Sequence, residues 1–123
     1  ISLHMPYSDE TRNLIGAPEL RRMKKSAILL NLSRGGVVDE KALYKSLKNE
    51  SIFAAATDVL ANEPVHADEP LLQLKNCLVL PHIAAVTREA QKSVAMTAVE
   101  DILRFSRGEL LHHLVNLTEL ENR

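Results

Sequence analysis

Residues 27–36 read AILLNLSRGG, an apolar run followed by Arg34 and two glycines. The apolar part, residues 27–32, is too short for a helix of its own, so it favours a strand. Its nearly continuous hydrophobicity predicts burial on both faces of a sheet. Gly35 and Gly36 end the strand, because a residue without a side chain lets the backbone turn sharply and approach a ligand. Arg34 is therefore expected where a buried strand ends.

The alternation of short apolar runs with longer amphipathic segments continues on both sides of this stretch. Further strands are predicted at residues 1–3, 52–59 and 78–80, and Pro81 ends the last because it cannot donate to a ladder. The spacing of apolar residues predicts a short helix opened by Pro18 and a second helix capped by Asp39. Strands that alternate with helices indicate an α/β fold with a parallel sheet.

Two segments need separate interpretation. The run Ala54-Ala55-Ala56 could form a strand that a helix or cofactor approaches closely, although a helix remains an alternative. The longest helix is predicted from a cap at Thr87 to about Ser106, with Gly108 just beyond its end. Its apolar side consists of Val94, Ala95, Ala98, Val99, Ile102 and Phe105.

Composition limits the classes of function. The chain has 123 residues, so one compact domain is expected. Its formal net charge is −1, so we expect no strong attraction for nucleic acid or an anionic membrane. A small soluble ligand is the better expectation. No apolar stretch approaches the roughly 20 residues that cross a bilayer, and the start of the chain has no signal-peptide pattern. The single cysteine, Cys77, fits a reducing compartment, and we expect the cytoplasm. Because the chain starts at Ile1 within a predicted strand, we also expect further sequence upstream.

Each predicted strand is followed by a residue able to do chemistry, and the four residues are His4, Arg34, Asp58 and His82. The carboxyl ends of parallel strands line the ligand crevice of open α/β sheets. Any one of the four has an ordinary structural explanation, because polar residues mark the exits of buried strands in many proteins. Four in succession favour a ligand site.

Three residues have the chemistry of an acid–base site that binds an anion. The Arg34 guanidinium can grip a carboxylate with two parallel hydrogen bonds, although a surface arginine in a turn is the simpler alternative. His82 can exchange protons near neutral pH, and Glu63 can pair with it and keep the imidazolium populated, which makes a general acid. Taken singly, a structural histidine and a solvated glutamate remain the simpler explanations.

Other classes of site have little support. The five histidines show no His-x-x-x-His spacing of the kind that binds a metal ion. His112 and His113 are adjacent, so they would not share one face of a helix. Residues 21–25, RRMKK, fit a solvated helix end where cations complement the dipole. Ser33 has no nucleophile-elbow pattern, and Cys77 precedes an apolar strand in which burial would leave it inert. Metal binding and covalent catalysis are therefore not expected.

Five motifs together resemble the D-isomer-specific 2-hydroxyacid dehydrogenase family. In order, they are SLHMP at residues 2–6, NLSRGG at 31–36, TDV at 57–59, EP at 63–64 and PHIA at 81–84. The resemblance spans nearly the whole chain. It implies the later half of a doubly wound, Rossmann-like NAD(P)-binding domain over residues 1–107, followed by a segment at 108–123 that returns toward the substrate domain. Glyoxylate and hydroxypyruvate reductases resemble the chain most, and phosphoglycerate dehydrogenase does so nearly as well.

The resemblance also implies roles for individual residues. Arg34 would bind the carboxylate and keto oxygen of a small 2-hydroxy or 2-keto acid, His82 would move the proton, and Glu63 would support the charged imidazole. The cofactor, NAD(H) or NADP(H), would meet Asp58 at its nicotinamide end. The remaining cofactor contacts would come from His4, Pro6, Leu32, Ser33, Arg34, His82, Ala84 and Ala85. Members of the family usually form homodimers through this domain.

The sequence departs from the family pattern in two places. Ala84 and Ala85 stand where the family commonly has glycine soon after its catalytic histidine. The four glycines, Gly16, Gly35, Gly36 and Gly108, form no Gly-x-Gly-x-x-Gly loop. In the family that loop, and the residue that distinguishes NAD from NADP, lie upstream. We therefore expect an active parent enzyme and an inactive isolated chain. A non-catalytic NAD-sensing or corepressor-like relative and a purely structural α/β module remain alternatives.

Overall fold

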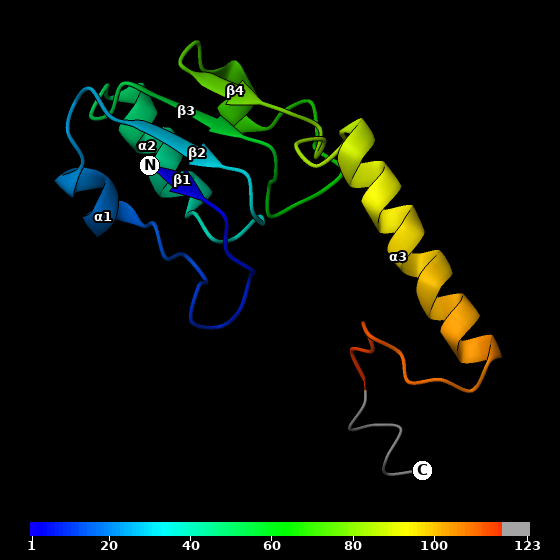
Figure 1. Ribbon diagram of the computed structural model, residues 1–123. Helices are drawn as coiled ribbons and strands as arrows, with labels where there is room; N and C mark the ends of the chain where they lie inside the picture. Colours follow the sequence, from blue (N-terminus) through cyan, green and yellow to red (C-terminus); the bar gives the residue numbers. More distant parts are fainter. Residues whose placement is uncertain (117–123) are drawn as a thin grey trace. The chain divides into compact units, whose positions relative to one another are not determined.

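The computed structural model describes residues 1–116, which form two compact units. The first unit, Ile1–Ala84, is built on a four-stranded parallel sheet in the order β1-β2-β3-β4 (Figure 1). The strands are β1 (Ser2–Leu3), β2 (Ile28–Asn31), β3 (Ala54–Thr57) and β4 (Cys77–Val79). The α/β prediction and all four predicted strands are thus confirmed. The alanine run lies in β3, so the helical alternative is wrong.

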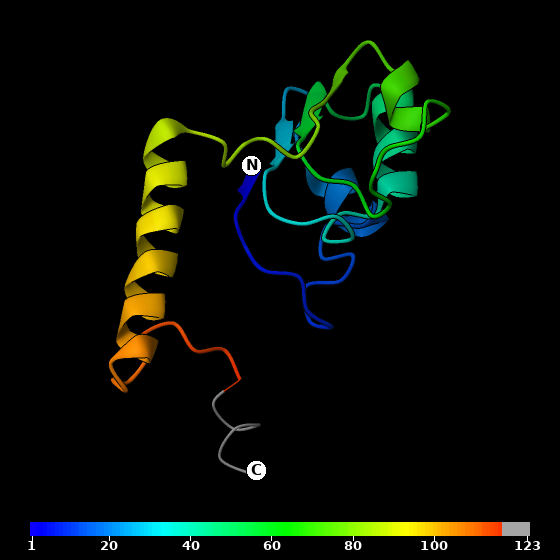
Figure 2. The same cartoon turned by 90° about the vertical axis from the view of Figure 1, so that its right-hand side faces the viewer.

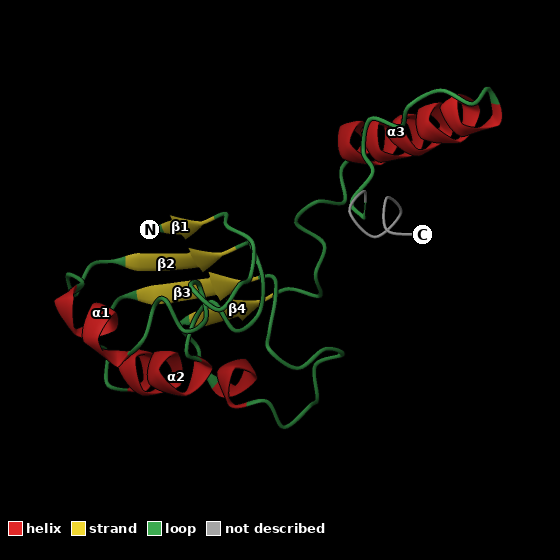
Figure 3. Cartoon of the chain, turned by 90° about the horizontal axis from the view of Figure 1, so that it is seen from below, coloured by secondary structure: helices red, strands yellow, loops and turns green. Residues whose placement is uncertain are grey.

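The connections between strands carry the helices of this unit. They are α1 (Ala17–Arg22), α2 (Glu40–Lys48) and the short 3₁₀ helix η1 (Pro70–Gln73). The predicted starts of both helices are confirmed. Pro18 lies in the first turn of α1, and the Asp39 carboxylate accepts a hydrogen bond of 3.0 Å from the Ala42 amide of α2. Figures 2 and 3 show α1, α2 and η1 on one side of the sheet. Parallel crossovers are almost always right-handed, so a sheet that grows in one direction receives its connecting helices on one face.

The core fills the space between this face and the helices. Neighbouring strands bring Leu3, Leu29 and Ala55 to the same side, and the helices contribute Leu20, Leu43, Leu47 and Leu71. Full burial of one such leucine contributes roughly 1.5–3 kcal/mol. This core fixes β2 and β3 against α2, and so fixes the segments that follow these two strands.

The opposite, outer face of the sheet is open in the described unit. It carries Ile28, Leu30, Ala54, Ala56 and Leu78, and Ile28 and Leu78 are 45% and 58% exposed. The expectation that β2 is buried on both faces is therefore wrong for this unit. The reason is topological, because all the connecting helices lie on the other face.

The second unit begins at Ala85 and contains α3 (Arg88–Ser106). The Thr87 hydroxyl accepts a hydrogen bond from the Ala90 amide, and Gly108 follows the helix with a φ of 70°. Both predicted ends of this helix are confirmed. No residue of α3 is buried, and its predicted apolar side is exposed. In the described part of the chain, none of the helices combines the length and apolar character that a membrane span requires. The last part of the predicted C-terminal segment, residues 117–123, lies outside the described residues.

Candidate active site

The carboxyl ends of the four strands lie at one edge of the sheet because the strands are parallel. His4 directly follows β1, and Asp58 directly follows β3. Arg34 and His82 follow β2 and β4 after short turns. All four strand-end residues therefore leave the sheet at the same edge, as predicted.

Glu63 and His82 form a direct pair at this edge. The distance between Nδ1 of His82 and Oε2 of Glu63 is 2.8 Å, and Oε1 of Glu63 accepts a hydrogen bond of 3.0 Å from the Leu60 amide. These two hydrogen bonds, with the larger effect from the histidine, lower the pKa of Glu63. Among residues 1–116, Nε2 of His82 has no hydrogen-bond partner. The His82 side chain is partly exposed, and a carboxylate holds its Nδ1 nitrogen.

Asp58 holds the backbone on which His82 stands. His82 has a φ of 57°, a left-handed conformation that costs of order 1–3 kcal/mol for a residue with a side chain. The two carboxylate oxygens of Asp58 accept hydrogen bonds of 2.8 and 2.7 Å from the amides of Ile83 and Ala84. Asp58 is 2% exposed, so these amides also compensate for the burial of its charge. The carboxylate thereby fixes the turn that aims the imidazole.

Arg34 lines a hollow beside the ends of β1 and β2. The hollow has a volume of about 320 Å³, and its other lining residues are His4, Met5, Pro6, Leu32 and Ser33. The predicted cofactor residues from these two strand ends thus share one cavity. Nη1 of Arg34 donates a hydrogen bond of 2.8 Å to the Ser33 carbonyl, and the side chain of Arg34 is exposed.

Asn31 shapes the site, although its place in the sequence predicted no role for it. Its Oδ1 accepts hydrogen bonds of 3.2 Å from the Ser33 amide and 2.8 Å from the Ser33 hydroxyl. Its Nδ2 donates a hydrogen bond of 3.1 Å to the Arg34 carbonyl. A polar residue at the end of an apolar strand was the available signal, because a buried amide must find such partners. Asn31 therefore shapes the turn that presents Arg34.

A second hollow at this edge has a volume of about 600 Å³ and is lined by Glu63, Pro64, Val65, Leu80, Pro81 and His82. The structure thus brings Glu63 and His82 together, and it places Arg34 in the hollow of about 320 Å³ beside β1 and β2. Ala84 is tied to Asp58, whereas Ala85 begins the second unit. The catalytic and cofactor-binding roles of these residues stay predictions.

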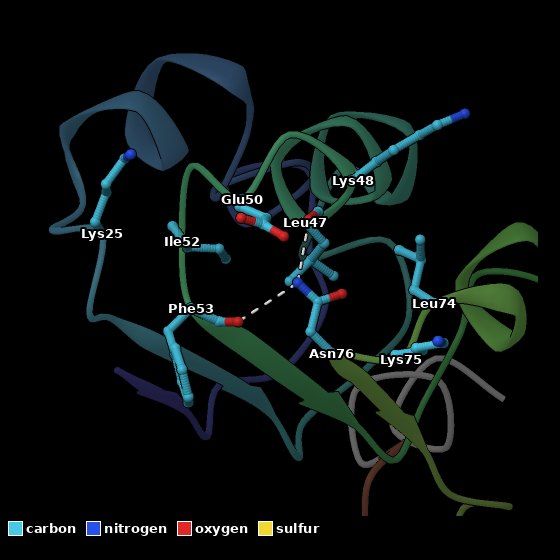
Figure 4. Close-up of a pocket in the computed structure, with 9 residues that line it drawn as sticks. All are labelled: Lys25, Leu47, Lys48, Glu50, Ile52, Phe53, Leu74, Lys75 and Asn76. Carbon is cyan, nitrogen blue, oxygen red and sulfur yellow. Dashed lines mark hydrogen bonds between the residues drawn. The ribbon is translucent and has the colours of Figure 1, made fainter.

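A third hollow lies at the opposite edge of the sheet, where the strands begin (Figure 4). Its volume is about 550 Å³, and it contains none of the predicted site residues. Lys25, Lys48 and Lys75 line it, but their side chains point in different directions (Figure 4). Nδ2 of Asn76 is bound to the carbonyls of Leu47 and Phe53. This cavity therefore has no converging set of donors for a ligand.

Two other places with reactive side chains, the Asp101–His112–His113 cluster and Cys77, lack the features of a catalytic site. Asp101 accepts hydrogen bonds from the His112 amide and the His113 ring, and within residues 1–116 no group of three or more potential ligands could hold a metal ion. Burial, reinforced by the charge of Glu69, raises the pKa of the Cys77 thiol to about 11. A thiol with so high a pKa is a poor nucleophile at neutral pH.

The family of the chain follows from comparison with known proteins. The sequence model of the protein family described as "D-isomer specific 2-hydroxyacid dehydrogenase, NAD binding domain" matches residues 1–84. The chain belongs to this family. The matched range coincides with the first compact unit, which carries the four strands and the Glu63–His82 pair. The resemblance inferred from the motifs is therefore confirmed.

Individual family members agree with this assignment. The chain is 47% identical over 116 residues to a glyoxylate reductase of Korarchaeum cryptofilum, covering 94% of the chain and 35% of that protein. It is 46% identical over 121 residues to a D-3-phosphoglycerate dehydrogenase of Archaeoglobus fulgidus, covering 98% of the chain and 23% of that protein. The crystal structure of D-lactate dehydrogenase with NAD+ from Lactobacillus jensenii superposes with a TM-score of 0.84 at 32% identity, covering 94% of the chain and 39% of that structure. The chain thus spans well under half the length of these relatives, and its Rossmann-like fold is that of their NAD-binding domains.

Proposed function

We propose that the chain forms part of an oxidoreductase that transfers a hydride between a nicotinamide cofactor and a small D-2-hydroxy or 2-keto acid. The observation that carries the proposal is the 2.8 Å contact between Glu63 and His82 at the carboxyl edge of the family's NAD-binding fold. Relatives of the chain include a glyoxylate reductase, a D-3-phosphoglycerate dehydrogenase and a glyoxylate/hydroxypyruvate reductase B, and these support a substrate of the glyoxylate, hydroxypyruvate or 3-phosphoglycerate type.

The lining of the strand ends fits the nicotinamide end of NAD(H) or NADP(H). The hollow beside β1 and β2 offers Pro6 and Leu32 as apolar contacts for a flat ring, next to the polar side chains of His4 and Ser33. Asp58 follows the neighbouring strand β3, and we propose that it contacts the nicotinamide end of the cofactor in addition to its structural bonds. When bound, a nicotinamide would supply the hydride for reduction and accept it in oxidation.

The residues of the chain would handle the proton and the substrate charge. His82 would donate a proton from Nε2 to the keto oxygen, while Glu63 stabilises the imidazolium through Nδ1. Arg34 would bind the substrate carboxylate with its planar fork, whose N–H groups other than the one on Ser33 remain available. In the oxidation direction, neutral His82 would take the proton from the hydroxyl group.

We also propose that the protein is a cytoplasmic homodimer, as is usual in the family. The alternative function is a non-catalytic NAD-sensing or corepressor-like relative that keeps the site. This alternative predicts cofactor binding without turnover, so activity distinguishes the two functions directly. A sedimentation measurement of the whole protein tests the dimer independently of activity.

The deciding experiment measures NADH and NADPH oxidation by the whole protein with glyoxylate and hydroxypyruvate. We expect Arg34→Ala to lower kcat/KM by about 100-fold or more while the cofactor Kd changes little, because the guanidinium acts on the substrate. Arg12→Ala is the matched control, since Arg12 is an exposed arginine that pairs with Asp9. Cofactor binding with no turnover on any small 2-keto acid would favour the alternative. Unchanged turnover in Arg34→Ala would refute the role of Arg34.

A further inference from the structure

The backbone on the two sides of Leu60 contacts both halves of the proposed site. The Leu60 amide, which belongs to the peptide between Val59 and Leu60, donates a hydrogen bond to Glu63. A Cβ added to Gly35 would lie 2.0 Å from the Leu60 carbonyl oxygen, so the turn after Arg34 packs directly on the next peptide, between Leu60 and Ala61. Leu60 joins these two peptides, so the positions of Arg34 and of Glu63 both depend on where the Leu60 backbone lies.

Glu40 fixes the Leu60–Ala61 peptide from outside the loop. Its Oε1 accepts a hydrogen bond of 2.6 Å from the Ala61 amide, across 21 residues of sequence. Glu40 is the first residue of α2, and α2 is anchored in the core by Leu43 and Leu47. A rigid helix thus holds the loop that carries Glu63.

We propose that Glu40 is a positioning residue, which holds the Leu60–Ala61 peptide and thereby keeps Glu63 in contact with His82. The inference deepens the proposed function and rests on it. Glu40 itself touches neither Glu63 nor His82 within hydrogen-bond distance, so it would act through the backbone. Nothing in the family resemblance of the motifs pointed to this residue.

The surroundings of Glu40 have opposite effects on the pKa of its carboxyl group. Burial raises the pKa of Glu40 most, and the nearby carboxylates of Glu69, Asp39 and Glu63 raise it further. The hydrogen bond from the Ala61 amide acts in the opposite direction. A half-buried carboxylate among three other acids would be unfavourable without such a donor.

The test compares three substitutions of Glu40 in the whole protein. Glu40→Ala removes the acceptor, and Glu40→Asp withdraws it by one methylene while keeping an acidic residue in the first turn of α2. Glu40→Gln keeps an oxygen that can accept from Ala61. Lys41→Ala is the control, because Lys41 is exposed on the same helix turn.

We expect kcat/KM for 2-keto acid reduction to fall about 10-fold in the Ala and Asp variants and to stay near wild type in the Gln variant and the control. The high-pH limb of the reduction profile should also move to lower pH by about half a unit, because a looser Glu63 supports the protonated imidazole less well. A merely structural loss would lower the rate at every pH without moving the limb.

A second measurement does not depend on turnover. Carbon-13 NMR of the Glu63 carboxyl in the same variants should show its lowered pKa rising toward 4.5 in Glu40→Ala and Glu40→Asp, but not in Glu40→Gln. If the wild-type protein has no activity and this rise still occurs, the proposed function fails and the positioning role stands. An active enzyme with an unmoved limb and an unmoved Glu63 pKa in folded Glu40→Asp overturns the inference.

Discussion

Cys77 lies half-buried in β4, where burial and the charge of Glu69 raise the pKa of its thiol to about 11. At pH 8 only about one thiol in a thousand would be ionised, since each unit below the pKa lowers the thiolate fraction tenfold. We expect Cys77 to react with a thiol reagent far more slowly in the folded chain than in urea. Equal rates in the two states would contradict its burial.

Glu63 provides a pH dependence whose sign follows from its lowered pKa. A carboxyl with a lower pKa in the folded state stabilises the fold above its ordinary value of 4.5, and this contribution disappears as the pH falls through the folded value. The pair is partly exposed, so the contribution should be at most about 1 kcal/mol. Urea unfolding should therefore show Glu63→Gln less stable than wild type at pH 7, with a difference that shrinks as the pH falls below 4.5. A difference that grew on acidification would contradict the pairing.

At the scale of residues, the sequence indicated groups with chemistry of their own and missed those that act through the backbone. Glu63 and His82 could be paired because a carboxylate and an imidazole have an obvious mutual role, and the structure joins them. Glu40 could not be found in this way, because its partner is an amide 21 residues away and every residue except proline has an amide. The motifs therefore predict the reacting side chains better than the groups that hold them.

At the scale of elements, the turn after β2 depends on the absence of a side chain at Gly35. A Cβ there would lie 2.0 Å from the Leu60 oxygen and 2.2 Å from its carbonyl carbon, and backbone atoms cannot rotate away. We expect Gly35→Ala to destabilise the chain by about 2 kcal/mol, as measured by urea unfolding.

Gly16→Ala is the matched control for this substitution. The nearest atoms to an added Cβ at Gly16 are 3.4 to 3.6 Å away, which are ordinary contacts, and its φ is −107°. We expect a change within about 1 kcal/mol for a glycine replaced at a helix cap. Equal losses for the two glycines would show that the close approach of Gly35 to Leu60 does not exist in solution.

Helix boundaries were predictable because they depend on local contacts. The caps at Asp39 and Thr87 each bind an amide three residues ahead, within one turn of chain. The burial of β2 was not predictable in the same way, because an apolar run shows that a strand prefers contacts without showing which neighbour supplies them. In the described unit one face of β2 packs on the helices and the other is open.

At the scale of the whole molecule, the two faces of the sheet should respond differently to substitution. Leu29 is 1% exposed on the core face, whereas Leu78 is 58% exposed on the outer face. In this chain, Leu29→Ala should cost about 3 kcal/mol through lost burial and a cavity. Leu78→Ala should change the free energy of unfolding by about 0.5 kcal/mol or less. Similar losses in urea unfolding would show that the outer face is covered in solution.

The segment from Asp58 to Glu63 is attached at nearly every step. The Asp58 amide donates to the Asn31 carbonyl, the Ala61 amide to Glu40, and the Leu60 amide to Glu63 itself. The hydrogen bonds of this segment therefore fix its length in residues more strictly than the identity of its side chains. Natural or laboratory variation in it should therefore consist of exchanges and not of insertions or deletions, because one added or lost residue would part the acid from its histidine without disturbing the core.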